Sequence, residues 1–403
     1  MEVASLQTLL LFISFISFYV YIFLLRRKPN KTATHGFKSY PLVGTLPDFL
    51  LNRHRFLDWT TAILSRCPNN TAVFRRPGKI HGVITANPQI VEHMLKSNFD
   101  NFPKGVRSRT LLKDFLGEGI FNSDGDLWKI QRKTASYEFN TKSLRNFVME
   151  NVAFELKTRL IPILENSARN DTVLDFQDIL ERFAFDNICK VAFNVDPGCL
   201  GGDGTVGGEF MRAFEDAANL SSEVELKILQ ELENIRLQNG KTIGDTYSFD
   251  ELREMHYLQA SITEAMRLYP PVPIDTKACN KDDILPDGTF IGKNWFISYL
   301  TFAMGRMESV WGKDCCEYKP ERWIENGIWK QESPFKYPVF HAGARMCLGK
   351  DMAFIQMKSI AASVLERFGM DVVMEKGKCP EYLLSLTLRM KGGLPVKAKE
   401  RIV

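Results

Sequence analysis

The sequence has no Cys-x-x-Cys pair and no large excess of charge of either sign, and both absences limit what the chain can do. Its eight cysteines are spread over 403 residues, so the chain is neither short nor rich in cysteine. This usage is typical of a reducing compartment, with structural thiols in place of disulfide bridges. The formal net charge of +4 is too small and too dispersed to indicate a nucleic-acid partner. The length suffices for one large domain or two ordinary ones.

Charged residues are also absent from the segment Val3–Leu25 near the N-terminus. At about 1.5 Å per residue, a helix over this run reaches about 34 Å, enough to cross the hydrocarbon core of a bilayer. The basic run 26–28 follows directly, so the positive-inside rule places the remaining chain in the cytosol. A cleaved signal peptide is the alternative, but it would carry its basic residues first. We therefore expect a membrane anchor over residues 1–28.

The rest of the chain divides into a hinge and one large domain. Residues 29–50 contain three prolines and two glycines, a composition typical of a stiff connection. Residues 51–403 combine many amphipathic helix patterns with short strand patterns, which predicts a mainly α fold with small β-sheets. Strands are expected at residues 72–74 and 80–85, and a strand hairpin at 382–396 that turns at Gly392–Gly393.

The most informative stretch is the cysteine loop, residues 340–350, with the sequence FHAGARMCLGK. Cys347 lies just before a helix pattern over residues 350–368, where the helix dipole favours a thiolate over a thiol. A single cysteine thiolate is one of the known axial ligands of haem iron. Gly343 permits a tight turn that a side chain would block. Arg345 can form charge-assisted hydrogen bonds with an acidic group.

The spacing Phe-x-x-Gly-x-Arg-x-Cys-x-Gly in this loop resembles the haem-binding signature of the cytochrome P450 family. A buried inert cysteine is the structural alternative, but it leaves the four fixed neighbours unexplained. The resemblance implies a cytochrome P450 fold, with Cys347 as the metal ligand that binds the iron of haem b. It also implies that the other fixed positions of the loop are cofactor-binding: Phe340, Gly343, Arg345 and Gly349.

Trp128 and Arg132 are four residues apart, so on a helix they share a face. Taken alone, the pair is read as a core tryptophan beside a solvated arginine. The resemblance implies a different role, because the family uses a Trp-x-x-x-Arg pair to bind haem propionates. Lys129 and Lys133 on the same segment offer a basic face to a reductase, although such faces are more often only solvated.

Three charged residues in the second half of the chain form a further candidate network. Glu264 and Arg267 are three apart on a predicted helix that ends at two prolines, residues 270–271. An exposed ion pair worth well under 1 kcal/mol is the plain interpretation. The resemblance implies that Arg322, in the run Pro-Glu-Arg-Trp, joins them in a buried structural network beneath the cysteine loop.

The sequence lacks the Ala/Gly-Gly-x-Asp/Glu-Thr run that the resemblance calls for in an oxygen-activating helix. Residues 210–222 are similar to the start of the family's distal helix, and residues 223–236 are similar to a helix that follows the oxygen-activating one. The chain is therefore roughly a hundred residues short, with a deletion at 222/223. No catalytic residue is assigned for this reason. The cysteine loop also lacks the insertion of oxygen-independent haem-thiolate isomerases.

The wider sequence around the cysteine loop is similar to plant fatty-acid omega-hydroxylases and to enzymes that oxidise jasmonoyl–amino-acid conjugates. The resemblance implies hydroxylation at the omega end of a long apolar carboxylate, with O2 and electrons from an NADPH-dependent reductase. It also implies a single-pass protein of the endoplasmic reticulum membrane with its catalytic domain in the cytosol. The alternative is an inactive, membrane-anchored remnant that binds haem but lacks the oxygen-activating helix.

Overall fold

Helices dominate the chain and strands form only small sheets, which confirms the predicted mainly α fold. The computed structural model describes residues 11–21, 36–40, 43–77, 80–139, 142–201, 222–373, 382–384 and 387–401. The longer helices are α3 (Phe56–Leu64), α7 (Gly125–Phe139), α8 (Lys142–Glu155), α9 (Ile161–Asn170), α10 (Phe176–Phe193), α12 (Ser222–Asn239), α14 (His256–Leu268) and α17 (Lys350–Leu365). The shorter helices are α2 (Leu46–Leu51), α4 (Pro88–Glu92), α5 (Gly105–Leu111), α6 (Lys113–Leu116), α13 (Phe249–Glu254), α15 (Thr301–Met304) and α16 (Glu308–Trp311).

The strands form one four-stranded sheet and several smaller ones. The largest sheet has the order β1-β2-β7-β4, in which only the β2–β7 pair is parallel. Its strands are β1 (Thr71–Arg76), β2 (Ile80–Thr85), β4 (Asp275–Ala278) and β7 (Phe296–Tyr299). A three-stranded sheet joins β10 (Phe368–Val372), β13 (Pro395–Glu400) and β3 (Leu174–Asp175). The two-stranded pairs are β5 (Asp283–Ile284) with β6 (Phe290–Ile291), β8 (Ile324–Glu325) with β9 (Ile328–Trp329), and β11 (Tyr382–Leu384) with β12 (Leu388–Met390).

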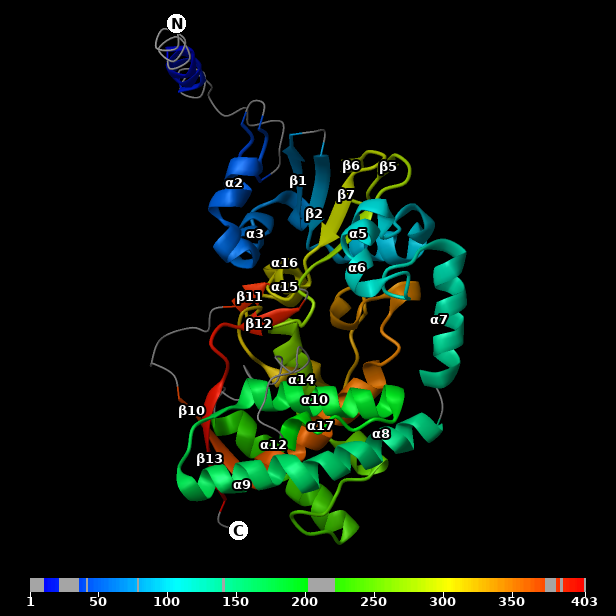
Figure 1. The fold of residues 1–403 in the computed structure, drawn as a ribbon, viewed down its shortest axis with the longest axis vertical. Coiled ribbons are helices and arrows are strands. Elements are labelled where there is room, and N and C mark those ends of the chain that lie inside the picture. The colour runs from blue at the N-terminus through cyan, green and yellow to red at the C-terminus, as the bar shows by residue number, and fades with distance from the viewer. Residues whose placement is uncertain are drawn as a thin grey trace, which may run out of the picture.

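Two large apolar cores organise these elements. Figure 1 shows the long helices and the four-stranded sheet that surround them at opposite ends of the molecule. The larger core lies among the long helices α8, α9, α10, α12, α14 and α17. The smaller core lies around the four-stranded sheet with α3 and α4. Helix α7 stands apart at one side of the ribbon in Figure 1, between these two regions.

Local sequence signals explain where several helices begin and end. The Asn87 side chain accepts a hydrogen bond from the Gln89 N–H, and Pro88 occupies the first position of α4. Ser248 and Glu251 form a capping box at the start of α13. Helix α14 ends before the two prolines at 270–271, as predicted.

The predicted hairpin over residues 382–396 is wrong. Strand β11 pairs with β12, so the turn of that hairpin falls before Leu388, whereas β13 pairs with β10 and β3. Gly392 and Gly393 both have positive φ and connect two different sheets. A pair of glycines permits a left-handed bend both in a hairpin turn and in a connection between two sheets. Local composition therefore does not distinguish the two.

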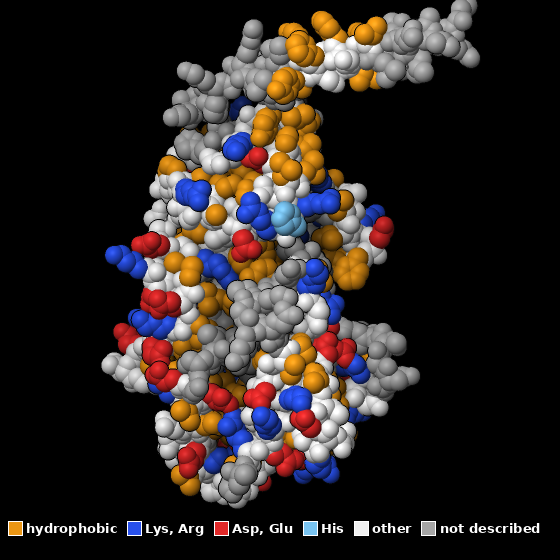
Figure 2. Space-filling view, turned by 90° about the vertical axis from the view of Figure 1, so that its left-hand side faces the viewer, with side chains coloured by type: hydrophobic (Ala, Val, Ile, Leu, Met, Phe, Trp, Pro, Cys, Tyr) orange, Lys and Arg blue, Asp and Glu red, His pale blue; other side chains and the backbone are white. Residues whose placement is uncertain are grey.

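The predicted N-terminal anchor is only partly visible. Residues 11–21 form a helix with exposed side chains, and the other residues of Val3–Leu25 lie outside the described part of the chain. Within the described residues, no helix is both long enough and apolar enough to span a membrane. Figure 2 shows hydrophobic side chains gathered at the end of the molecule next to this helix, where Leu50 and Leu51 of α2 are exposed.

Two further predicted segments fall mostly outside the described residues. These are the glycine-rich loop over residues 201–208 and the start of the distal helix over residues 210–222. Helix α12 begins at Ser222, so residues 223–236 are helical as predicted. Helix α2 begins at Leu46, inside the expected hinge.

Candidate active site around Cys347

The cysteine loop lies between short helical turns and the start of α17. The Cys347 N–H donates a hydrogen bond of 2.8 Å to the Phe340 carbonyl, which closes the loop on itself. The Phe340 ring packs against Phe354 of α17, with ring centroids 5.3 Å apart. Gly349 caps α17, and a Cβ at this position would lie 3.6 Å from Phe139 at the end of α7. These contacts place Cys347 between α17 and α7.

Gly343 is required by both its conformation and its surroundings. Its φ is +64°, and a Cβ at this position would lie 2.0 Å from the Leu95 carbonyl oxygen. Leu95 belongs to a π-helical turn, His93–Ser97, that follows α4. Since a real Cβ cannot approach backbone so closely, the loop can press against this turn only with glycine. The predicted tight turn at Gly343 is therefore confirmed.

The Cys347 side chain is exposed, although neighbouring groups partly desolvate its sulfur. Burial raises its pKa, while a backbone hydrogen bond from Gly349 and the charge of Arg132 act in the opposite direction. Helix α17 begins at Lys350, as predicted, and the backbone hydrogen bond from Gly349 at its start acts in favour of the thiolate and against a bound thiol proton. A bound metal cation would displace this proton.

Arg345 links the cysteine loop to the start of α7. One of its terminal N–H groups donates to the Ser123 carbonyl at 2.9 Å and to the Asp124 carboxylate at 2.8 Å. Its guanidinium also lies 4.3 Å from the centroid of the Trp128 ring. Asp124 in turn accepts hydrogen bonds from the N–H groups of residues 104 and 105. Arg345 therefore has an acidic partner, but that partner is a side chain of the protein.

Trp128 and Arg132 lie on α7, as their spacing predicts. Trp128 is buried, and its ring contacts Phe99 and the Arg345 guanidinium. Among the described residues, neither the Trp128 indole N–H nor the Arg132 guanidinium has a hydrogen-bond partner. Burial lowers the pKa of Arg132, and its charge acts on Cys347. Two donors without a protein partner in the described part of the chain, close to the exposed Cys347, fit an anionic group such as a haem propionate.

Sequence reasoning missed a buried lysine near the same loop. Lys277 of β4 is fully buried, and its Nζ lies 2.6 Å from the Asp275 carboxylate and 3.4 Å from His341 Nε2. Burial lowers the pKa of Lys277, and the charges of Lys104 and Arg345 lower it further, while Asp275 raises it. Burial raises the pKa of Asp275, but Lys277 and His341 outweigh this effect and keep it well below its usual value.

Residues two apart on a strand share a face, so Asp275 and Lys277 form a recognisable pair. A strand lysine beside an aspartate is nevertheless usually solvated. The burial of Lys277 and its contact with His341 of the cysteine loop distinguish this one. The basic groups Arg132 of α7 and Lys277 of β4 therefore lie near the loop, which contributes Arg345 itself.

The predicted network beneath the loop is present and buried. Glu264 accepts hydrogen bonds from Arg267 at 2.7 and 2.8 Å, and Arg322 lies 3.4 Å from the same carboxylate. Glu264 and Arg267 are 0% and 1% exposed, which rules out a simple surface ion pair. Arg322 also donates to the Trp311 carbonyl and pairs with Asp314. Tyr337 connects the network to the cysteine loop through a hydrogen bond to the Thr263 carbonyl.

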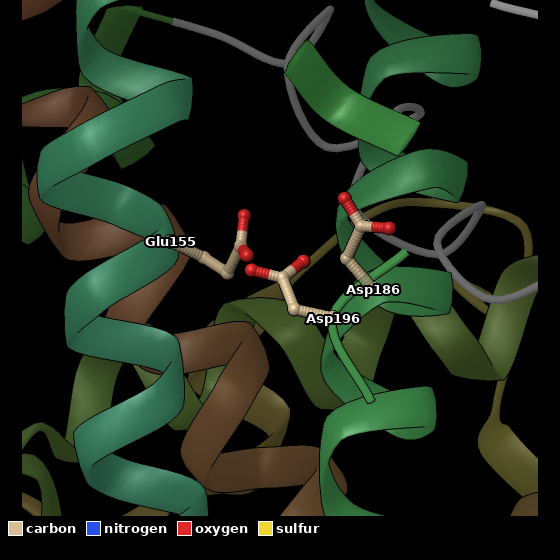
Figure 3. Close-up of side chains that lie close together, drawn as sticks. All are labelled: Glu155, Asp186 and Asp196. Atoms are coloured by element: carbon tan, nitrogen blue, oxygen red, sulfur yellow. The ribbon is translucent and has the colours of Figure 1, made fainter. Parts of the chain in front are cut away.

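A second cluster of acidic groups lies away from this site. Figure 3 shows Glu155 of α8 facing Asp186 of α10 and Asp196 beyond its end. Their carboxylate oxygens lie within 4.8 Å of one another, the spacing of a possible metal site. Arg159 already contacts all three, at 2.7 Å from Asp196 and 3.6 Å from Asp186, and is hydrogen-bonded to Glu155. The cluster is therefore neutralised in part by a side chain of the protein.

A mainly helical fold with a cysteine loop at the head of a late helix, above a buried Glu–Arg–Arg network, defines a haem-thiolate protein. The family model of cytochrome P450 matches residues 35–217 and 219–396. The chain is 41% identical to cytochrome P450 CYP94D108 of Paris polyphylla over 478 aligned positions, covering 94% of each chain. It is 35% identical to cytochrome P450 94A2 of Vicia sativa over 512 positions, covering 100% of this chain and 99% of that relative.

A third relative, cytochrome P450 94B1 of Arabidopsis thaliana, is 37% identical and covers 90% of this chain and 91% of its own. The chain thus belongs to the cytochrome P450 family of haem-thiolate monooxygenases. The aligned positions outnumber its 403 residues, so these relatives contain residues that this chain lacks. The family match is also interrupted at residue 218.

Proposed function

We propose that the chain is a haem-thiolate monooxygenase that hydroxylates the omega end of a long-chain fatty acid or a fatty-acyl-type conjugate. In this proposal Cys347 supplies the thiolate ligand of haem b. The geometry of the cysteine loop is the main observation in support. The loop packs against Leu95 at Gly343, and the Trp128 and Arg132 donors, which have no partner among the described residues, lie near it.

Each residue of the loop has a separate task in this proposal. Gly343 allows the backbone to approach Leu95, Gly349 lies at the start of α17 beside Phe139, and the Phe340 carbonyl accepts the Cys347 N–H while its ring shields the sulfur side. Trp128 and Arg132 are the donors available to the two propionates, and Arg345 and Lys277, which already pair with Asp124 and Asp275, add positive charge nearby. Bound haem supplies the oxygen chemistry, and NADPH supplies the electrons through a separate reductase. Glu264, Arg267 and Arg322 keep the loop in position beneath the cofactor.

The proposed partners, a reductase and a membrane, are inferred from the family membership and from exposed side chains on the surface. The exposed Lys129 and Lys133 on α7 are proposed to contact an NADPH-cytochrome reductase. The exposed apolar side chains of residues 11–21 and α2 support attachment to the endoplasmic reticulum membrane, from which a long apolar carboxylate would enter. A single-pass anchor over residues 1–28 and a cytosolic domain over 51–403 remain part of the proposal.

A second candidate function is an inactive haem-binding remnant, and one observation favours it. Side chains of α5, α6 and the following turn are strongly exposed: Val106, Leu111, Phe115 and Phe121 are each more than 70% exposed. Apolar side chains in such number usually have a covering element. A deletion at 222/223 would remove the helix that shields the distal side, and water would then reach bound oxygen.

Two measurements test these proposals. Purified protein reduced with dithionite under carbon monoxide is expected to show the Soret band of a thiolate-ligated haem, and Cys347→Ala is expected to abolish it. Cys189→Ala, on α10, serves as the control and should retain the band. Turnover of a long-chain fatty acid with reductase and NADPH then separates the candidates. Omega-hydroxy product above the Cys347→Ala background supports the monooxygenase, whereas a thiolate Soret band without product supports the remnant.

A further inference from the structure

Two adjacent cysteines lie next to the buried network and have no role in the proposed reaction. Cys315 and Cys316 are in the turn that follows α16, and their sulfur atoms are 3.9 Å apart. Cys315 is buried, whereas Cys316 is exposed. A reagent in solution can therefore reach Cys316, while the Cys315 sulfur lies close enough to react with it next. Cys316 is the first group to react because its sulfur is the exposed one, whereas burial raises the pKa of the Cys315 thiol.

The peptide group that joins these cysteines is a ligand of the network. Arg267 donates a hydrogen bond of 2.6 Å to the Cys315 carbonyl, which belongs to this peptide group. The Arg267 side chain is 1% exposed and also binds Glu264. A movement of the peptide would therefore leave a buried guanidinium N–H without one of its acceptors. A reaction at the two sulfurs can therefore disturb, through the Cys315 carbonyl, the buried network that supports the cysteine loop.

A disulfide between adjacent cysteines is necessarily strained. Consecutive Cα atoms are about 3.8 Å apart across a trans peptide. Disulfides usually join Cα atoms about 4.4–6.8 Å apart, and departures from this range make the bond easier to reduce. The ring that closes over Cys315 and Cys316 can relieve the strain only by rotating the peptide between them. Strained, exposed disulfides are the labile and regulatory ones.

We propose that Cys315 and Cys316 form a reversible oxidation site whose closure withdraws the Cys315 carbonyl from Arg267 and loosens the Glu264–Arg267–Arg322 network. The oxidant is hydrogen peroxide. The Cys316 sulfur first attacks one peroxide oxygen, which gives a sulfenic acid and releases one water. The Cys315 thiol then attacks the Cys316 sulfur, forms the S–S bond and releases a second water. Two thiols and one peroxide thus give one disulfide and two waters, and a dithiol reductant reverses the reaction.

Peptide mapping of the full chain tests the chemistry. Trypsin cleaves after Lys313 but not between Lys319 and Pro320, so both cysteines fall in the peptide 314–322, which contains no other cysteine. After treatment with a small excess of peroxide and blocking of free thiols, this peptide is expected to lose two hydrogens and to carry no blocking group. Dithiothreitol should restore both reactive thiols. A peptide that keeps two free thiols, or that carries only a sulfinic acid on Cys316, overturns the proposal.

Thermal unfolding tests the coupling to Arg267. Oxidised wild-type protein is expected to unfold at a temperature lower by roughly 2 °C or more, and dithiothreitol should remove the shift. Cys316→Ser, a change at an exposed side chain, is expected to unfold at the same temperature before and after peroxide. If the wild-type peptide carries the disulfide and the unfolding temperature is unchanged, the link to the network is refuted. Haem binding and turnover do not enter either measurement, so failure here leaves the proposed function untouched.

Discussion

The Arg322 guanidinium lies 3.4 Å from the Glu264 carboxylate, although 58 residues separate the two in the chain. The same carboxylate accepts hydrogen bonds from the Trp323 indole N–H at 2.8 Å and from the Lys319 N–H at 3.0 Å. With the two bonds from Arg267, both carboxylate oxygens of Glu264 accept hydrogen bonds. Such a network adds little net stability over apolar packing, but the loss of one member leaves buried charge without a partner.

Glu264→Gln is therefore expected to lower the free energy of unfolding by about 3–5 kcal/mol, because Arg267 and Arg322 lose the buried carboxylate that they share. Urea-induced unfolding measures this loss. Glu325→Gln is the matched control, since Glu325 forms an exposed pair with Lys330. Its expected cost is below about 0.5 kcal/mol. Equal costs for the two variants would contradict a structural role of the network.

Local pattern predicted this network better than any other part of the site. The spacing of Glu264 and Arg267 is a helix property, and the Pro-Glu-Arg-Trp run identifies Arg322 by resemblance. The predictions failed or were silent where distant segments meet. Lys277 contacts His341 only because β4 is placed beside the cysteine loop, and Arg345 meets Asp124 only because α7 stands against it. Such pairings depend on tertiary packing, which short-range periodicity does not contain.

Gly343→Ala is expected to destabilise the protein more than the same substitution at a glycine that has a similar φ but no close neighbours. Gly240 provides the control, because its φ of +62° matches the +64° of Gly343, yet no atom lies within 4 Å of its Cβ position. Gly240→Ala should cost about 1–2 kcal/mol for the left-handed backbone. Gly343→Ala adds a clash with the Leu95 carbonyl, and overpacking of this kind costs about 1–3 kcal/mol more. Unfolding by denaturant gives both values, and equal losses would refute the close contact.

Arg132→Gln is expected to weaken haem binding by roughly 10- to 100-fold, because one charge-assisted hydrogen bond is worth about 1.5–3 kcal/mol. Lys129→Gln is the control on the same helix. The Lys129 side chain is 62% exposed and lies 3.5 Å from Asp126. This substitution should leave haem binding unchanged and raise the KM for reductase instead. Titration of the apoprotein with haem distinguishes the variants. Equal haem affinities for wild type and Arg132→Gln would contradict the propionate role of Arg132.

The internal deletion illustrates another limit of sequence reasoning. Helix α12 forms as its own pattern predicts, although the segment that precedes it in longer relatives is not present. A helix depends mainly on its own apolar face and on neighbours that survive the deletion, here α14 and α17. Local pattern therefore predicts a helix such as α12, but it does not reveal that the apolar side chains of α5 and α6 are left exposed.

Glu155 gives the protein a pH-dependent stability with an unusual sign. Burial raises its pKa to about 7, Asp186 and Asp196 add to this effect, and Arg159 opposes it. One Glu155 oxygen is buried without a hydrogen-bond partner, which suits a protonated carboxyl. The folded state therefore retains a proton that the unfolded state releases near pH 4.5, so this contribution is complete below about pH 4.5 and is lost as the pH rises to about 7.

Glu155→Gln stays neutral and should remove this component. Relative to wild type, the variant is expected to gain about 1–2 kcal/mol in unfolding free energy between pH 5 and pH 8, after allowance for solvent screening. Denaturant titrations at several pH values measure the difference. Glu150→Gln, an exposed change on the same helix, is the control and should follow the wild-type curve. A constant offset between Glu155→Gln and wild type across this range would show that Glu155 is ionised throughout, with Arg159 outweighing the two aspartates and burial.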